Sequence, residues 1–400
     1  MFPDRLIRES DSRILLCVLD GLGDLPGPDR PDTPLEAAHT PNLDGLAAAG
    51  TSGLFTPVAA GVTPGSGPGH LALFGYDPVT YQVGRGVLSA LGVDFDLQPG
   101  DVAARLNFCT LDAEGRITDR RAGRIATDVN RARLARLRSE VTAPDGVQLF
   151  WETESEHRGL LVLRGPDLCD DLHDTDPQIT GVPPLAARAS NPRAHRTATL
   201  VGEIISRALQ VLNDAPPANG LLLRGFASRP AWPDVESRYG LRALAVTKYP
   251  MYRGVAKLVG MATAAPYDTI EEAPAGLRAG WSDFDFFFLH FKDPDKAGED
   301  GDFESKRAAI ETFDRIVPEL LALGPDVMVV TGDHSTPVAL AGHSWHPVPV
   351  LLHAPATARP DTVETFGERA AICGGLGQRP MCELMAQMLA HAGRLEKFGA

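Results

Sequence analysis

Runs of apolar residues alternate with helical patterns in the first part of the chain. Six consecutive apolar residues at 14–19 predict a strand that is buried on both faces. A helix is expected soon after it, with Thr40 as N-cap, Pro41 at the first helical position and Gly50 closing the helix. Strand, turn and helix in this order indicate an α/β fold.

The C-terminal part shows the same alternation of apolar runs and amphipathic stretches. The pattern predicts strands at 284–291, 327–331 and 348–352, an amphipathic helix at 302–323 and a last helix at 381–392. Strands that alternate with helices favour a mostly parallel sheet with helices on both of its faces.

The middle of the chain has a different pattern. Residues 102–121 alternate like a β-hairpin with a turn at 112–115, and proline-broken polar stretches lie around it. We therefore expect a discontinuous core domain at 1–78 and 236–400, with a smaller α/β insert at 79–235.

Composition excludes several classes of protein. The net charge is −14 over 400 residues and no run is rich in Lys and Arg, which excludes a nucleic-acid-binding protein. Five scattered cysteines without a CxxC pair are typical of reduced thiols in the cytoplasm. Asp20 interrupts the first apolar run, which argues against a signal peptide, and no run approaches the about 18 apolar residues of a membrane span. We expect a cytoplasmic protein without membrane attachment or an obligate protein partner.

Acidic and histidine side chains follow several expected strands, at the sheet edge where ligands gather in parallel sheets. They are Asp20, Asp295, Glu299, the pair Asp333 and His334, and the histidines His343 and His346. An Asp after a strand most often caps a helix or turn, and a lone Asp-His pair is most often structural. Several carboxylates at one edge, however, would repel one another without a cation. This mixture of carboxylates and imidazoles predicts a site for Mn²⁺ or Zn²⁺ that also accepts Mg²⁺ or Co²⁺.

Ser66 is a candidate nucleophile, because it stands between two glycines just ahead of an expected helix at 70–75. A helix N-terminus offers free N–H groups and a positive dipole end, which favour a phosphate or a phosphoserine. Coordination to a metal would lower the pKa of the hydroxyl and prepare it for attack. A Gly/Pro turn capped by Ser66 fits the spacing equally well.

Longer motifs run from residue 18 to the last residue. They are VLDGLGD at 18–24, TPLEAAHTPNLD at 33–44, HLALFGYDP at 70–78, GRG at 84–86, DRRAGR at 119–124, VVTGDHST at 329–336, HSWHPVP at 343–349 and AGRLEKFGA at 392–400. In these motifs the chain resembles the archaeal-type cofactor-independent (2,3-bisphosphoglycerate-independent) phosphoglycerate mutases of the alkaline phosphatase superfamily.

The resemblance implies an alkaline-phosphatase-like core with an inserted domain that acts as a lid. It also implies an isomerase that interconverts 3-phosphoglycerate and 2-phosphoglycerate in glycolysis and gluconeogenesis, through a phosphoserine at Ser66 and without added 2,3-bisphosphoglycerate. The alternative is a metal-dependent phosphatase or phosphotransferase that shares the core and acts on another small phosphorylated metabolite.

The resemblance further implies two divalent metal ions. One set of ligands corresponds to Asp295, Glu299 and His343, and the other to Asp20, Ser66, Asp333 and His334. His343 is preferred to His346 because of its spacing from the Val-Pro pair at 348–349.

Two positions depart from the family pattern. Glu299 replaces an imidazole ligand by a carboxylate, and Gly67–Pro68 follow Ser66 where an acidic and a hydroxyl residue are expected. Hard oxygen donors favour Mn²⁺ and Mg²⁺ over ions that prefer softer nitrogen ligands. We therefore expect Mn²⁺ as the preferred metal, with Mg²⁺, Co²⁺ or Zn²⁺ as substitutes.

A substrate with a phosphate and a carboxylate suits arginine, which binds both groups with two parallel hydrogen bonds. The candidate substrate-binding residues are Arg120, Arg121, Arg124, His157, Arg158 and Arg224. Lys248 resembles the catalytic lysine that faces the transferring phosphate in this family.

Overall fold

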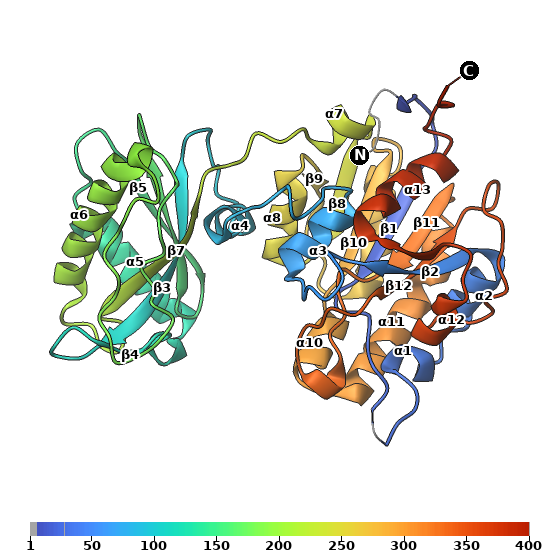
Figure 1. Ribbon diagram of the computed structural model, residues 1–400, viewed down its shortest axis with the longest axis horizontal. Coiled ribbons are helices and arrows are strands. Elements are labelled where there is room, and N and C mark those ends of the chain that lie inside the picture. The colour runs from blue at the N-terminus through green and yellow to red at the C-terminus, as the bar shows by residue number, and fades with distance from the viewer. Residues whose placement is uncertain (1–5, 28, 400) are drawn as a thin grey trace. The chain divides into compact units, whose positions relative to one another are not determined.

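The computed structural model describes residues 6–27 and 29–399, and the chain divides into two compact units (Figure 1). One unit contains the residues up to Gln82 and those from Pro233 onward, and the other contains Val83–Trp232. The larger unit is therefore discontinuous in sequence. The sequence analysis put the boundaries of the insert at 79 and 235.

The larger unit is built on an eight-stranded sheet in the order β13-β2-β12-β11-β1-β10-β8-β9. Its strands are β1 (Ile14–Leu19), β2 (Thr51–Thr56), β8 (Ala243–Thr247), β9 (Ala262–Thr263), β10 (Phe286–Phe291), β11 (Val327–Thr331), β12 (Val348–His353) and β13 (Gly377–Pro380). Only β12 runs antiparallel to its neighbours β11 and β2; the other pairs are parallel. The expected mostly parallel α/β sheet is confirmed.

Helices cover both faces of this sheet. Every residue of the central strands β1, β10 and β11 is therefore buried. The helices are α1 (Pro34–Ala37), α2 (Pro41–Ala49), α3 (Ser66–Leu73), α7 (Val235–Tyr239), α8 (Pro250–Leu258), α9 (Ala273–Gly280), α10 (Asp293–Glu299), α11 (Phe303–Leu321), α12 (Glu368–Ile372) and α13 (Leu384–His391). In α11 the expected apolar face is buried. Across the described residues, no helix combines the length and apolarity needed to cross a membrane.

Helix α2 begins and ends as expected, with Thr40 at the N-cap, Pro41 as its first residue and Gly50 at the C-cap. The Thr40 side chain makes no capping hydrogen bond within the described residues; the Asp314 carboxylate of α11 accepts from the N–H groups of Asn42 and Leu43 instead. The expected start of the next helix is wrong. Ser66 does not precede a helix at 70–75 but is the first residue of α3. Gly65 takes the N-cap position, and Pro68 fits the first turn because N–H groups there need no helical acceptor.

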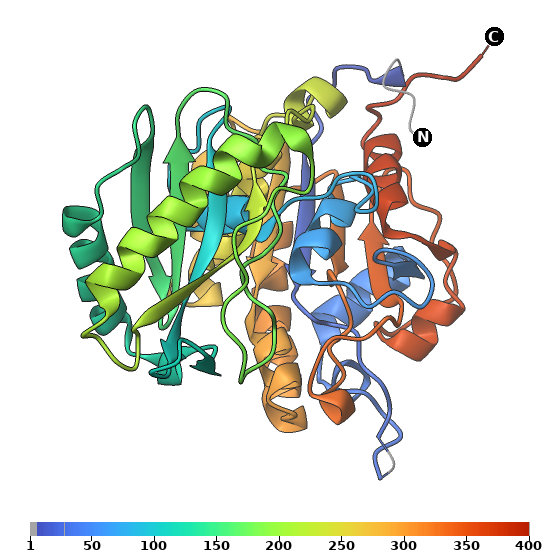
Figure 2. The same cartoon turned by 60° about the vertical axis from the view of Figure 1, so that its left-hand side comes forward.

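The smaller unit contains a five-stranded antiparallel sheet in which β4, β3, β6 and β5 lie in that order and β7 pairs with β3. The elements are α4 (Arg85–Gly92), β3 (Val102–Leu111), β4 (Ile117–Asp119), α5 (Thr127–Glu140), β5 (Gln148–Ser155), β6 (Arg158–Arg164), α6 (His195–Leu212) and β7 (Gly220–Ala227). The expected hairpin at 102–121 is formed by β3 and β4. Helices α5 and α6 share one core with the sheet, and α6 lies across it (Figure 2).

The sheet topology of the larger unit gathers the predicted metal ligands. Strands β1, β10 and β11 are parallel neighbours, so the segments that follow them leave the sheet at one edge. Because β12 is antiparallel to β11, the residues before Val348 lie at the same edge. The predicted ligands after the three parallel strands thereby come close to His343.

Candidate functional site

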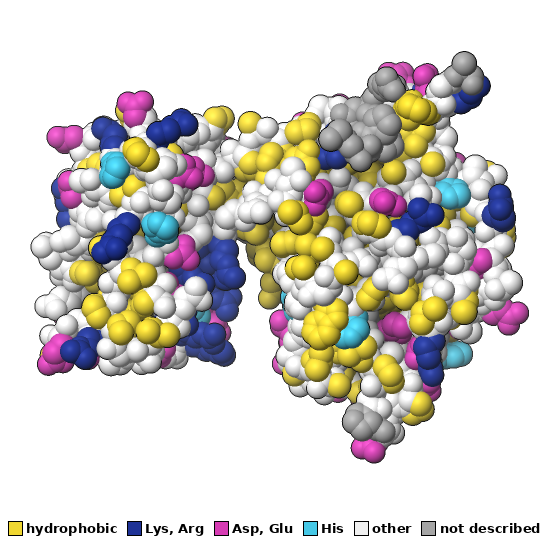
Figure 3. All heavy atoms as spheres, viewed as in Figure 1, with side chains coloured by type: hydrophobic (Ala, Val, Ile, Leu, Met, Phe, Trp, Pro, Cys, Tyr) yellow, Lys and Arg dark blue, Asp and Glu magenta, His cyan; other side chains and the backbone are white. Residues whose placement is uncertain are grey.

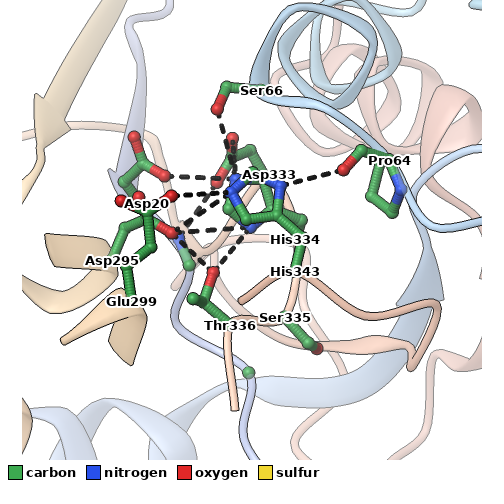
Figure 4. A network of polar contacts seen from close by, with 12 residues as sticks. Asp20, Pro64, Ser66, Asp295, Glu299, Asp333, His334, Ser335, Thr336 and His343 are labelled. Carbon is green, nitrogen blue, oxygen red and sulfur yellow. Dashed lines mark hydrogen bonds and ion pairs between the residues drawn. The ribbon is translucent and has the colours of Figure 1, made fainter. Parts of the chain in front are cut away.

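Three oxygen atoms surround one imidazole nitrogen at this edge (Figure 4). The Nε2 atom of His334 lies 3.4 Å from Asp20 Oδ1, 3.2 Å from Asp333 Oδ2 and 3.3 Å from Ser66 Oγ. Both carboxylates and the imidazole are fully buried. We call these four residues the Ser66 cluster.

The Ser66 cluster fits a divalent ion. Asp20 Oδ1 and Asp333 Oδ2 are buried, and the described groups nearest to them are imidazole nitrogens, those of His334 and, for Asp333, of His70. Two buried carboxylates this close together are costly unless a cation neutralises them. Ligand atoms about 2.1 Å from a tetrahedral ion lie about 3.4 Å from one another, close to the three distances measured around His334.

A second group lies beside the first. Asp295 Oδ1 lies 3.6 Å from His343 Nε2 and 3.9 Å from His334 Nδ1, and the rings of the two histidines stack with their centroids 3.7 Å apart. His343 Nδ1 is hydrogen-bonded to the carbonyl oxygen of Pro64, which leaves Nε2 facing Asp295 (Figure 4). The atoms of Asp295, His334 and His343 are close enough to hold an ion together.

Glu299 lies at the rim of this second group. Its Oε1 is 3.7 Å from Nε2 of His343, and its side chain is 55% exposed. His346 contacts the hydroxyl of Ser344 through Nδ1 and is not among the converging atoms. The structure therefore brings His343 into the group, and ligation by Glu299 stays a prediction.

The sequence analysis missed Lys292, which contacts one carboxylate of each group. Its Nζ lies 3.2 Å from Asp20 Oδ2 and 2.5 Å from Asp295 Oδ2. Burial alone would raise the pKa of Asp20, but a hydrogen bond from His290 and the Lys292 charge outweigh it and hold that pKa well below its ordinary value. A signal was present, since Lys292 directly follows a strand that ends at the ligand edge.

Ser66 opens α3, so its hydroxyl lies among the N–H groups of the first turn, which favour negative charge. The helix can approach Asp333 closely because residue 69 is glycine. A Cβ atom on Gly69 would lie 2.5 Å from the carbonyl oxygen of Asp333. The approach places the Ser66 hydroxyl beside the two buried carboxylates.

A cavity of about 500 Å³ lies next to Lys292 in the larger unit. Lys248, Lys296, Glu299 and His290 are among its lining residues. The Nζ atom of Lys248 donates a hydrogen bond to the carbonyl oxygen of Asp268. The predicted catalytic lysine thus lines the cavity that reaches Lys292, but it contacts none of the Ser66 cluster.

The smaller unit has a separate basic pocket, and basic side chains gather along one edge of this unit (Figure 3). The pocket has a volume of about 330 Å³ and is lined by Arg85, Arg105, Asn107, Arg120, Arg121, His157, Arg158 and Arg224. We call these eight residues the arginine pocket. Five of the six predicted substrate-binding residues line it; Arg124 does not.

A buried carboxylate, Asp176, and a half-buried one, Glu154, hold the arginine pocket in place. Asp176 accepts hydrogen bonds from Arg120 Nε and Nη2 at 2.9 and 2.7 Å and lies 3.5 Å from Arg224 Nη1. Glu154 accepts from Arg105 at 3.1 Å. Burial and the neighbouring Arg158 lower the pKa of His157 to about 4, so its ring is neutral near pH 7.

Several polar atoms of the arginine pocket are buried without a hydrogen-bond partner among the described residues. They are Arg105 Nε, Arg224 Nε, Asn107 Oδ1 and His157 Nδ1. Donors on guanidinium groups beside an amide oxygen suit a ligand that carries an anionic group and hydroxyls.

Sequence reasoning missed three residues of this pocket, Arg85, Arg105 and Asn107. Arg105 and Asn107 stand at alternate positions of β3, where Arg105 is opposite Arg224 on β7 and Asn107 is opposite Arg158 on β6. Two polar residues at alternate positions within the apolar stretch 102–109 were the available signal. Arg85 stands in the GRG motif, whose glycine at 86 lets α4 approach β3.

Comparisons with known proteins agree on one family. A family model described as 2,3-bisphosphoglycerate-independent phosphoglycerate mutase matches residues 47–218. A probable enzyme of that name from Thermus thermophilus is 50% identical to the chain, and the similarity covers 100% of both.

Two solved structures extend this similarity to the fold. A protein from Pyrococcus horikoshii aligns with a TM-score of 0.81 and 32% identity over 97% of this chain and 99% of its own. A cofactor-independent phosphoglycerate mutase from Thermoplasma acidophilum aligns with a TM-score of 0.74 and 30% identity over 96% and 100%.

Proposed function

The chain belongs to the family of 2,3-bisphosphoglycerate-independent phosphoglycerate mutases, and we propose that it interconverts 3-phosphoglycerate and 2-phosphoglycerate through a phosphoserine at Ser66. The observation that carries this proposal is the position of the Ser66 hydroxyl, 3.3 Å from His334 Nε2 and at the N-terminus of α3. A hydroxyl placed there is accessible to a phosphate and lies where negative charge is stabilised. As a glycolytic enzyme it would act in the cytoplasm.

We propose two divalent ions at the site, with Mn²⁺ preferred. Asp20, Ser66, Asp333 and His334 would hold one, and Asp295 and His343 would hold the other together with Glu299. When bound, such ions neutralise phosphate charge and lower the pKa of a serine hydroxyl.

Ser66 then acts as the nucleophile of the first of two successive transfers and as the leaving group of the second. Its hydroxyl loses a proton and its oxygen bonds to phosphorus, while the bond from phosphorus to the glycerate oxygen breaks and that oxygen takes up a proton. The glycerate turns, its other hydroxyl loses a proton and its oxygen bonds to phosphorus, while the bond from phosphorus to Ser66 Oγ breaks and that oxygen regains a proton. Free N–H groups at the start of α3, and Lys248 and Lys292, would stabilise the phosphate charge.

The arginine pocket would hold the glycerate through its carboxylate and hydroxyls. The glycerate carries no phosphate between the two transfers, so it must be retained until the second one occurs. We propose that the smaller unit acts as a lid that keeps water from the phosphoserine, because hydrolysis would turn the mutase into a phosphatase.

Loss of an arginine from the pocket should weaken substrate binding. Arg224→Ala is expected to raise the KM for 3-phosphoglycerate about 10- to 100-fold, the effect of removing a charge-assisted hydrogen bond. Steady-state kinetics measure this change, and the Mn²⁺ affinity should stay unchanged. Arg124→Ala is the matched control, since Arg124 does not line the pocket. The KM of this variant for 3-phosphoglycerate should change less than about threefold. Equal effects of the two substitutions would contradict the assignment.

The metal preference should depend on Glu299. Glu299→Ala is expected to weaken the binding of one Mn²⁺ about 10-fold or more and to lower kcat, while Glu299→His should shift the preference toward Zn²⁺ or Co²⁺. Calorimetric titrations with each metal ion measure the affinities. Asp300→Ala is the control, because this neighbouring exposed carboxylate lies outside both groups of converging atoms in the described residues. Full Mn²⁺ occupancy and full activity in Glu299→Ala would show that Glu299 is a solvated rim carboxylate.

A coupled assay tests the proposed function. The protein is stripped of metal, reconstituted with Mn²⁺, Mg²⁺, Co²⁺ or Zn²⁺, and given 3-phosphoglycerate and enolase without 2,3-bisphosphoglycerate. We expect metal-dependent formation of phosphoenolpyruvate. No turnover with any of the four ions would contradict the proposal, and release of free phosphate in its place would favour the phosphatase alternative.

A further inference from the structure

His70 is a fully buried residue of α3 one helical turn after Ser66. Its Nδ1 atom lies 2.8 Å from the carbonyl oxygen of Ser66 and 3.1 Å from Oδ2 of Asp333. Both atoms are hydrogen-bond acceptors, so Nδ1 must carry the hydrogen. The opposite ring atom, Nε2, is buried and has no hydrogen-bond partner in the described part of the chain.

His290 is a fully buried residue of β10 with the reverse arrangement. Its Nε2 atom lies 3.0 Å from Oδ2 of Asp20, whereas Nδ1 lies 3.5 Å from the hydroxyl of Thr247. A carboxylate oxygen accepts a hydrogen, so Nε2 of His290 carries it. The hydroxyl of Thr247 can donate to the remaining nitrogen.

The two imidazoles lie in one buried aromatic group. Their centroids are 5.1 Å apart, and Tyr252 stacks on His290 at 3.7 Å and lies 4.7 Å from His70. Neighbours on several sides restrict the rotation of each ring, so each carboxylate meets one defined nitrogen. The contacts bear on Asp20 and Asp333, the two carboxylates of the Ser66 cluster.

We propose that His70 and His290 are positioning residues that hold Asp333 and Asp20 through opposite ring nitrogens, Nδ1 of His70 and Nε2 of His290. His70 also ties the peptide of Ser66 to Asp333, so one side chain sets the distance between the nucleophile and a carboxylate of its cluster. Residues that orient ligating carboxylates in this way change metal affinity about 10- to 100-fold when they are replaced. The inference rests on the proposed metal site.

A crossed set of amide substitutions tests this proposal. Asparagine places its N–H₂ near the position of Nδ1 and glutamine places it near the position of Nε2. We therefore expect His70→Asn to keep the Mn²⁺ affinity within about threefold and His70→Gln to weaken it about 10- to 100-fold. At position 290 the order should reverse, with His290→Gln close to the wild type and His290→Asn weakened.

The crossed design separates positioning from packing, because a residue that only fills space would favour the same amide at both positions. The weakened variants should also lose kcat with a smaller change in the KM for 3-phosphoglycerate, since the residues proposed to hold the glycerate line the arginine pocket. The same order of amides at positions 70 and 290 would overturn the proposal. Calorimetric titration with Mn²⁺ alone needs no substrate, so it distinguishes failure of this inference from failure of the proposed mutase activity.

A second measurement uses the wild-type protein and does not depend on the folding of any variant. Nitrogen NMR of histidine-labelled, Mg²⁺-loaded enzyme reports which ring nitrogens carry hydrogen. We expect hydrogen on Nδ1 of His70 and on Nε2 of His290. A bare Nδ1 at His70 or a bare Nε2 at His290 would overturn the proposal.

Discussion

Replacement of Ser66 by alanine is expected to abolish isomerisation of 3-phosphoglycerate, with a loss of kcat on the order of 10⁴-fold or more. The Ser66 hydroxyl is the atom of the Ser66 cluster that we propose forms the covalent intermediate, since the carboxylates and the imidazole are assigned to the metal ions. Its removal leaves the buried carboxylates and His334 in place, so the fold should be intact and Mn²⁺ should still bind, although more weakly.

Mass spectrometry checks the location of the phosphate. Wild-type enzyme quenched in acid during turnover should carry one added phosphate on the peptide that contains Ser66, and the alanine variant should carry none. Thr63→Ala is the control, because Thr63 is a nearby hydroxyl residue outside the cluster and its loss should leave activity largely unchanged. Phosphate on Thr63, or turnover by Ser66→Ala, would contradict the assignment.

Replacement of His334 should have the second large effect, because its imidazole belongs to both groups of candidate metal-ligating atoms. Its Nε2 faces Asp20 and Asp333, and its Nδ1 lies 3.9 Å from Asp295 Oδ1. His334→Gln is expected to weaken both Mn²⁺ sites and to lower kcat about 10³-fold, since removal of a ligand and misplacement of the remaining ones act together.

Metal analysis after dialysis and calorimetric titration measure this loss. His346→Gln is the matched control: His346 lies on the loop that carries His343, contacts Ser344, and is outside both groups. Wild-type occupancy of both ions in His334→Gln would contradict the two-ion site. Loss of a single ion would show that His334 serves only one group.

The fold was predictable where burial dictates the residue pattern. Strands β1 and β11 coincide with their predicted ranges, because strands buried on both faces consist of continuous apolar runs. The position of Ser66 was harder to predict, because glycine at 65 and proline at 68 usually indicate a turn, whereas here they flank the first residue of α3. The rule that ligands gather at the carboxyl ends of parallel strands identified Asp20, Asp295 and Asp333.

The polar residues that contact the candidate metal ligands were not predictable from the sequence. His290 stands inside the apolar run of β10, where sequence reasoning assigns a histidine to the core. Its contact with Asp20 depends on the register of β1 against β10, which apolar runs do not specify.

The arginine pocket shows a similar limit. Arg124 follows the pocket residues Arg120 and Arg121 closely in sequence, but the backbone is left-handed at Gly123 and Arg124, with φ of 64° and 52°. The chain there forms a short 3-10 turn at Ala122–Arg124 with non-helical backbone inside it, so no shared face could be predicted from it. Arg105 and Arg224 instead meet across neighbouring strands.

The most direct test of the account follows the phosphate itself. Wild-type and Ser66→Ala enzyme, each loaded with Mn²⁺, are incubated with 3-phosphoglycerate without 2,3-bisphosphoglycerate, quenched with a chelator and analysed by phosphorus NMR. The account predicts that 2-phosphoglycerate appears with the wild type until equilibrium, that inorganic phosphate stays at background, and that the variant produces neither. Inorganic phosphate as the main product, or 2-phosphoglycerate formed by Ser66→Ala, would contradict it.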